Sequence, residues 1–232
     1  MNLRKMISLA LIITMLPAYA KVSAEELLGL TPANRTAAPI DGAVGNTPKE
    51  YIFEYGGQKF ILLDKEQKNE KTYFFVMTED VYGVYKYDNS ARSNTECLAY
   101  WEPEDEFNMA AWLNTEFLEN GNGGKALPEK IKEYIDEEHI WHTEPLKYLE
   151  GYQAEKLTES PLALLSNYEW KKYIGKIGQN VSERWFFRTA RTGDVTDSTN
   201  ILCTGIGHPL GTTGAWRANG TALGIRPVFY LD

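Results

Sequence analysis

The sequence predicts a single α+β domain with antiparallel strands, two or three short helices and a long, loop-rich C-terminal half. Three observations predict it. Short runs rich in aromatic and β-branched residues follow position 49, apolar residues then recur at helical spacing, and the chain returns to strand and loop after Gly178. The predicted domain covers residues 49–232, a length that suits one sizeable core.

The first 24 residues have the pattern of a signal peptide. Arg4 and Lys5 form a basic start, and residues 7–16 are apolar. Ala18-Tyr19-Ala20 places small residues around a cleavage site, and Val22-Ser23-Ala24 is a second candidate. The apolar run is short for a membrane span. We therefore expect a secreted protein without a transmembrane segment in the mature chain, and a flexible linker at residues 25–48. A buried N-terminal helix is the alternative interpretation.

An antiparallel meander should open the domain. Gly56-Gly57 separates two strand-like runs and tolerates the positive φ of a tight hairpin turn. The charged residues 65–71 indicate a second turn. The strands expected here are residues 51–55, 59–63, 72–78 and 82–87.

Three helical segments follow. The first is amphipathic, and glycines from Gly121 end it. Pro128 suits the start of a second, short helix. Ser166 and Glu169 form a capping box that begins a third helix through about Tyr173. The apolar positions of the first helix are Phe107, Ala110, Ala111, Leu113, Phe117 and Leu118.

The C-terminal half contains two aromatic strand candidates, residues 184–188 and 225–231, which bracket a polar loop from Arg191 to Leu223. Pro227 favours an extended conformation at Arg226. An arginine between apolar neighbours needs carbonyl or carboxylate partners, because a buried unpaired charge is costly. We interpret Arg226 as a structural anchor.

Four short motifs occur in order along the chain: Ala111-Trp112-Leu113-Asn114 followed by Phe117, Leu164-Leu165-Ser166, Arg184-Trp185-Phe186-Phe187-Arg188 and Gly224-Ile225-Arg226-Pro227. Together they resemble an uncharacterised extracellular domain family of Gram-positive bacteria. The family is related in fold to formylglycine-generating (sulfatase-modifying) enzymes and C-type lectins, so the resemblance implies a C-type-lectin-like fold. We expect Trp112, Trp185, Arg188 and Arg226 to be structural.

The net charge and the number of cysteines argue against two classes of function. The formal net charge of −8 argues against a nucleic-acid partner, which needs a basic face. The related formylglycine-generating enzymes use two nearby thiols, whereas only Cys203 lies in the C-terminal half, so we do not expect that activity. Cys97 and Cys203 could form one disulfide in an oxidising compartment, stabilising the fold by about 3–5 kcal/mol. Two buried thiols are the alternative.

The sequence contains possible calcium and zinc ligands, but no complete metal-binding motif. Asp194 and Asp197 could offer carboxylates to calcium, although solvated turn aspartates look the same in sequence. His139 and His142 would point to opposite faces of a strand and could not share zinc without a bend. We predict no metal and no cofactor, and interpret the acidic run 102–106 as a solvated face.

The Arg191–Leu223 loop is the predicted binding site. Its aromatic, guanidinium and amide groups could hold a glycan or a surface protein, with Trp216 stacking on a ring. Alternatively, Trp216 fastens the loop to the core. We predict a non-enzymatic binding module; a secreted hydrolase acting through an unidentified carboxylate pair is the alternative. The candidate ligand-binding residues are Arg191, Asp197, Asn200, Trp216, Arg217 and Asn219.

Overall fold

The fold is mixed α+β, with mostly antiparallel sheets and a few short helices, as the sequence predicts. The computed structural model describes Ala24 and residues 51–93, 97–143, 156–177, 183–192, 202–207 and 213–232. Apart from Ala24, the expected signal peptide and linker lie outside these ranges. Within them, no helix has the length and apolar character needed to cross a membrane.

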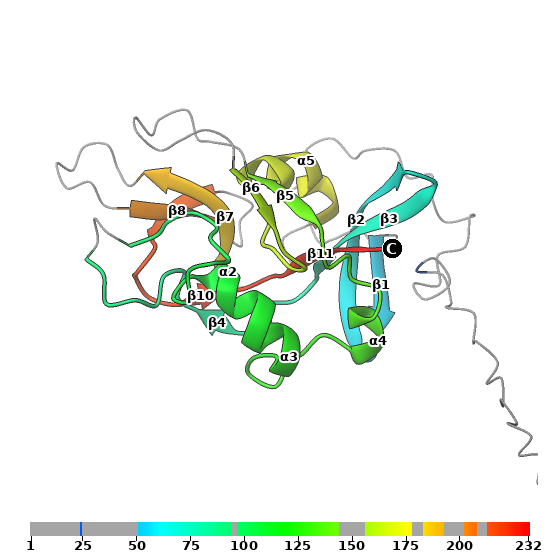
Figure 1. The fold of residues 1–232 in the computed structure, drawn as a ribbon, viewed down its shortest axis with the longest axis horizontal. Coiled ribbons are helices and arrows are strands. Elements are labelled where there is room, and N and C mark those ends of the chain that lie inside the picture. Colours follow the sequence, from blue (N-terminus) through cyan, green and yellow to red (C-terminus); the bar gives the residue numbers. More distant parts are fainter. Residues whose placement is uncertain are drawn as a thin grey trace, which may run out of the picture.

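Two sheets lie toward opposite ends of the molecule, with α5 and a two-stranded ribbon between them (Figure 1). One sheet has the strand order β1-β2-β3-β11, the other β4-β10-β7-β8-β9, and the ribbon is β5-β6. The strands are β1 (Ile52–Tyr55), β2 (Gln58–Lys68), β3 (Lys71–Thr78), β4 (Val84–Tyr85), β5 (Ile140–Thr143), β6 (Lys156–Glu159), β7 (Trp185–Thr192), β8 (Leu202–Gly207), β9 (Thr213–Arg217), β10 (Leu223–Gly224) and β11 (Val228–Leu231). The helical elements are α2 (Met109–Trp112), η3 (Leu113–Phe117), α3 (Leu118–Asn120), α4 (Glu129–Lys132) and α5 (Asn167–Ile177).

The first hairpin is confirmed, and the second turn is shorter than predicted. Gly56 and Gly57 both have positive φ and connect β1 to β2. The predicted turn at 65–71 is wrong, because β2 and β3 pair as far as Lys68 and Lys71. Only Asn69 and Glu70, both at positive φ, form the turn. Charged residues remain in the strand because this end of the hairpin is exposed to solvent.

The first predicted helix begins later than its apolar pattern suggests. Asn108 is the N-cap, and its side chain accepts a hydrogen bond from the Ala110 amide. Phe107 therefore lies before the helix and is 42% exposed, which corrects its assignment to the buried face. Between α2 and α3, η3 is one π-helical turn that still directs Leu113 and Phe117 into the core.

The other two helices begin where predicted. Pro128 is the N-cap of the short α4. At α5, the Glu169 amide donates to the Ser166 hydroxyl, and the Ser166 amide donates to the Glu169 carboxylate, which confirms the capping box. This helix continues to Ile177, a turn beyond the predicted end, because Ile177 is also buried.

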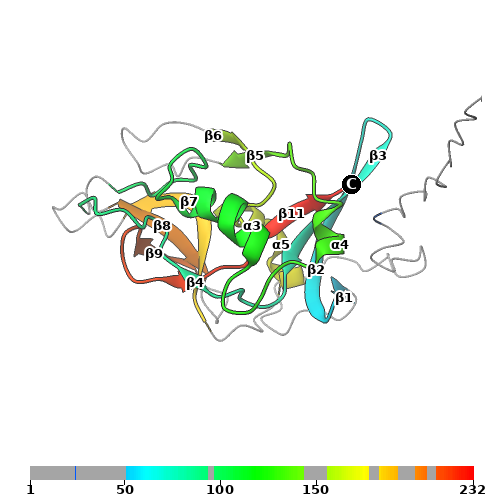
Figure 2. The same cartoon turned by 60° about the horizontal axis from the view of Figure 1, so that its bottom comes forward.

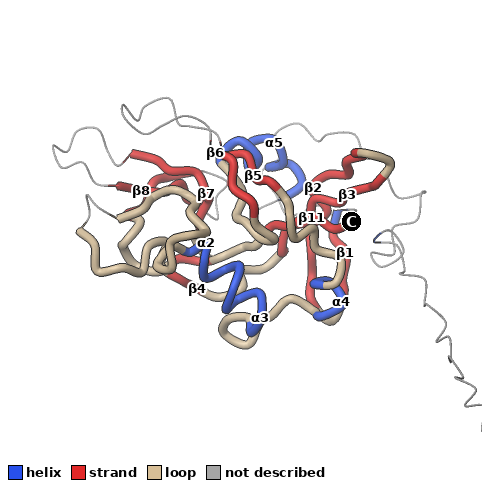
Figure 3. The backbone as a smooth tube through the Cα atoms, viewed as in Figure 1, coloured by secondary structure: helices blue, strands red, loops and turns tan. Residues whose placement is uncertain are grey.

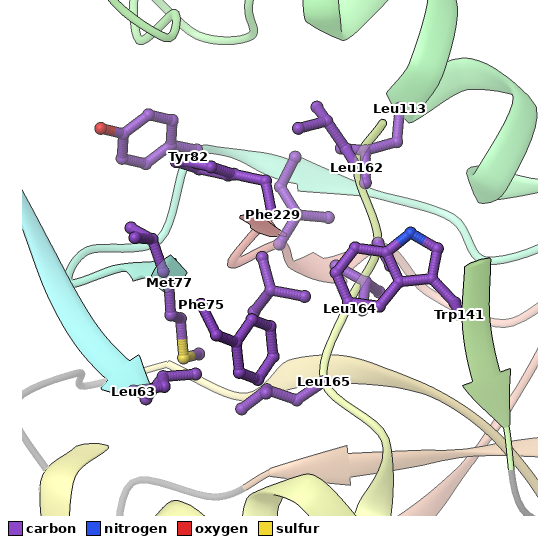
Figure 4. Close-up of a cluster of buried hydrophobic side chains, with 14 of the residues drawn as sticks. Leu63, Phe75, Met77, Tyr82, Leu113, Trp141, Leu162, Leu164, Leu165 and Phe229 are labelled. Carbon is purple, nitrogen blue, oxygen red and sulfur yellow. The ribbon is translucent and has the colours of Figure 1, made fainter. Parts of the chain in front are cut away.

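Side chains from both sheets and the central helices form one hydrophobic core (Figure 4). Phe75 of β3 stacks on Tyr230 of β11, with 4.7 Å between ring centroids, and Trp141 of the ribbon lies beside both. Leu162, Leu164 and Leu165 are buried in this core, with Leu162 beside Leu113 and Leu165 beside Phe75.

The C-terminal half contains more strand than predicted. The loop expected from Arg191 to Leu223 is wrong at residues 202–207 and 213–217, because these form β8, which pairs with β7, and β9, which pairs with β8. β11 lies deep in the molecule (Figure 2). It pairs with β3 along one edge, and bridges to Ala163 and Ile135 occupy the other edge. All four of its residues are buried, so its faces do not alternate between core and solvent.

Candidate functional site

The long loop between β4 and α2 lies at the end of the molecule that also holds β7 and β8 (Figure 3). Among the described residues, this loop carries a shallow, open pocket. We call it the acidic pocket. It has a volume of about 400 Å³ and combines one arginine, one phenylalanine and four acidic residues. Its lining residues are Arg92, Glu102, Glu104, Asp105, Glu106 and Phe107.

Within the part of the chain that the structure describes, Arg92 is the one cation that lines the acidic pocket. Its Nη1 lies 2.6 Å from a carboxylate oxygen of Asp105 and 3.5 Å from one of Asp88. The hydrogen bond to Asp105 raises the pKa of Arg92. Its guanidinium carbon lies 5.7 Å from the ring centroid of Phe107, within the range of cation–π attraction. The pocket geometry therefore already accommodates one cation between an aromatic ring and carboxylates.

Two buried polar residues hold the base of this loop. Asp88 is fully buried and accepts hydrogen bonds from the amides of Ser90 at 2.8 Å and Leu98 at 2.5 Å. Asn108 forms a β-bridge with Asp88 and donates to the carbonyl of Tyr100 at 3.0 Å. These hydrogen bonds give partners to the backbone groups of an irregular, partly buried segment. Without them, buried polar groups would be left unpaired, which costs free energy.

The structure places only part of the predicted binding loop. Asp197, Asn200 and the candidate calcium ligand Asp194 lie outside the described residues. The backbone of Arg191 belongs to β7 and pairs with β8, and its side chain is outside the described part of the chain. Arg217 is exposed at the end of β9, beside Trp216. The loop therefore contributes Trp216, Arg217 and Asn219 to one described region.

Trp216 and Asn219 are both engaged within the protein. Trp216 packs against the core, and its Nε1 donates to the carbonyl of Thr221 at 3.1 Å. The guanidinium carbon of Arg184 lies 5.5 Å from its ring centroid. Asn219 donates from Nδ2 to the Arg92 carbonyl at 3.1 Å, which connects the predicted loop to the acidic pocket.

Arg188 lies in a different, fully buried environment. Its guanidinium makes five hydrogen bonds, two of them to both carboxylate oxygens of Glu169, at 2.6 and 2.7 Å. The other three reach the Leu164 carbonyl, the Thr143 hydroxyl and the His142 carbonyl. Five donors with five partners leave no group of Arg188 for a ligand.

The other residues expected to be structural lie at element contacts. Arg226 is buried and donates to the carbonyls of Thr78 and Glu79, with its guanidinium carbon 5.1 Å from the Trp185 ring centroid. Burial lowers the pKa of Arg226 to about 10. Trp112 is half-buried and stacks on Tyr85 with ring centroids 4.0 Å apart.

The cysteines and histidines give no metal site in the described ranges, where no cluster of three potential ligands occurs. Cys97 is buried, whereas the side chain of Cys203 lies outside the described residues, so the disulfide stays a prediction that mass spectrometry without reductant can decide. His139 stacks inward on Tyr230, with ring centroids 4.0 Å apart. His142 is exposed on the ribbon, away from that stack.

Sequence reasoning missed Arg92 and Phe107 as pocket residues. It placed Phe107 on a helix and treated the acidic run as a plain solvated face. One local signal was available: Asn108 is a favoured N-cap residue, and it separates Phe107 from the helix. Arg92 gave no signal, because its contacts depend on the folded loop. No protein-family model, curated protein or solved structure matches this chain.

Proposed function

We propose that this chain is a secreted, non-enzymatic binding module with a C-type-lectin-like domain, and that the acidic pocket binds ligands bearing amino or guanidinium groups. The lectin-like part rests on the motif resemblance and on the α+β architecture. Secretion rests on the signal-peptide pattern of residues 1–24.

The observation that carries the ligand class is the lining of the pocket. The lining contains four carboxylates and one arginine, so it has an excess of negative charge, and Phe107 remains 42% exposed beside the Arg92 guanidinium. Cations are attracted both to carboxylates and to aromatic faces. The net charge of −8 acts in the same direction at longer range, because it attracts cations during encounter.

The ligand chemistry has two natural sources, an amino-bearing glycan and a basic segment of a surface protein. Binding to chitosan oligomers should be compared with N-acetylated oligomers of equal length, and binding to hexa-arginine with hexa-citrulline, each with and without calcium. We expect the charged member of at least one pair to bind more tightly, with an affinity that falls as salt is added. Equal binding of charged and neutral members would contradict the proposal.

A matched variant ties the binding to this site. Replacing Glu102, Glu104 and Glu106 together by glutamine removes three negative charges and keeps the side-chain size. We expect the preference for the charged probe to disappear. The control is the same substitution at Glu129, Glu133 and Glu137, which lie in or just after α4. Loss of binding in the control alone would place the ligand elsewhere.

A second candidate function is hydrolysis, which one observation favours: several carboxylates line the same pocket. Glycosidases use two carboxyl groups separated by roughly 5–10 Å. Asp105 is already engaged, since it pairs with Arg92 and accepts from the Phe107 amide at 2.9 Å. Turnover of a fluorogenic glycoside that is lost in the glutamine variant would replace the binding proposal with this one.

A further inference from the structure

The turn that follows β9 contacts the loop that carries the acidic pocket at three residues, of which Arg92 lines the pocket itself. Asn219 Nδ2 donates to the Arg92 carbonyl at 3.1 Å, and the Asp88 amide donates to the Ala218 carbonyl at 2.9 Å. The backbone amide of Asn219 donates to the thiol of Cys97. Two consecutive residues of the turn thus bond to three positions of the loop that carries the pocket.

These contacts reach both the arginine and the aromatic ring of the pocket. Asp88 bonds to the amides of Ser90 and Leu98 and pairs with the Arg92 guanidinium. The next residue, Asn89, donates its amide to the Phe107 carbonyl at 2.8 Å. A displacement of the turn would therefore be transmitted to Arg92 directly and to Phe107 through two residues.

The turn is itself closely packed. The Gly220 amide donates to the Arg217 carbonyl at 3.1 Å, and a side chain at Gly220 would begin 3.0 Å from that carbonyl oxygen and 3.2 Å from Trp216 Nε1. Ala218 is fully buried. Because the turn is tightly packed, it can hold the more exposed pocket loop in one position.

We infer that Asn219 is a positioning residue, which sets the shape of the acidic pocket through Arg92 instead of contacting the ligand. This inference rests on the proposed function, because it takes the pocket as the ligand site. One of the two side-chain N–H donors of Asn219 is already used within the protein, on the carbonyl of a pocket residue, which favours an indirect role. By thermodynamic reciprocity, a ligand in the pocket should also protect the turn.

The test compares Asn219→Asp, which removes the donor without changing size, with Asn219→Gln, which keeps an amide. Asn122→Asp is the matched control, because Asn122 Nδ2 donates to the Val84 carbonyl at 3.3 Å away from the pocket residues. Amide hydrogen exchange is measured without ligand. Loss of one hydrogen bond should speed exchange in residues 88–93 and 97–108 about fivefold in Asn219→Asp. It should leave these residues unchanged in Asn122→Asp.

The second measurement is hexa-arginine binding to the same variants. We expect Asn219→Asp to weaken binding about fivefold, even though its added negative charge would by itself favour the cationic probe, and Asn219→Gln to restore part of the affinity. Unchanged exchange in Asn219→Asp would overturn the inference, and so would faster exchange with unaltered affinity. A wild-type chain that does not bind the charged probes would overturn the proposed function, while the exchange data would still decide whether the turn supports the loop.

Discussion

Arg188 and Arg92 both pair with carboxylates, but they lie in opposite environments. The Arg188 side chain is fully buried and bonds to groups from β5, α5 and the segment before α5, whereas the Arg92 side chain is 33% exposed and lies over the ring of Phe107. The first arginine connects elements of the core, and the second helps to form a concave surface. An ion pair with a carboxylate therefore does not show by itself whether an arginine stabilises the core or lines a ligand site. The burial of the side chain and the number of its N–H donors that have partners distinguish the two roles.

The largest expected effect tests the buried pair. Replacing Glu169 by glutamine leaves Arg188 buried without a counter-charge and should lower the free energy of unfolding by about 3–5 kcal/mol. Urea denaturation measures it. The control is Glu133→Gln, whose exposed pair with Lys130 should contribute less than about 1 kcal/mol. A similar decrease in the free energy of unfolding in both variants would show that the buried pair contributes no more to stability than the exposed pair.

A smaller effect is expected at Asn108, where the pocket loop joins the first helix. Asn108→Ala removes the N-cap of α2 and the hydrogen bond to the Tyr100 carbonyl, and should cost about 1–2 kcal/mol. Asn108→Asp keeps the capping oxygen and should lose less. The same urea experiment applies. If the aspartate variant is as unstable as the alanine variant, the bond to Tyr100 matters more than the cap.

The next effect concerns pH. Burial holds the pKa of His139 below its usual value, while the nearby Asp136 carboxylate, 3.3 Å from Nδ1, opposes the shift. The unfolded chain therefore binds this proton more readily than the folded chain, and the free energy of unfolding should fall as pH drops below about 6.5. Glu66 and Arg188 also act on the ring. Denaturation between pH 7.5 and 5 measures the slope, which should be shallower in His139→Phe.

The smallest effect on stability is expected at the pocket. Phe107 is 42% exposed, so Phe107→Ala should change the free energy of unfolding by at most about 0.5 kcal/mol. Its affinity for hexa-arginine should nevertheless fall about two- to fivefold, the value of one exposed cation–π contact. Calorimetric titration measures the affinity. A large loss of stability would mean that this region belongs to the framework after all.

Features set by neighbouring residues were predictable from the sequence. The Ser166–Glu169 capping box and the Gly56-Gly57 turn depend on groups a few residues apart, and both were found where expected. The charged end of β2 was not predicted, because its pairing with β3 outweighs the composition of residues 65–68.

The site was less predictable, because it depends on contacts between distant segments. Asn219 meets Arg92 across 127 residues, and no local pattern in either segment indicates the other. The sequence pointed to Asn219 as a polar residue of interest but suggested a ligand contact. Arg188 was expected to be structural, yet its partners in β5 and before α5 could not be identified from spacing.

The position of β11 has a consequence for how the chain folds. Arg226 donates to the Thr78 carbonyl across 148 residues, and the strand that follows completes the sheet begun by β1, β2 and β3. Such long-range pairing slows folding. Until β11 is synthesised, β3 presents an unpaired edge next to Phe74 and Phe75, and exposed edges of this kind favour aggregation. A nascent chain that stops short of β11 is therefore the species most in need of a chaperone.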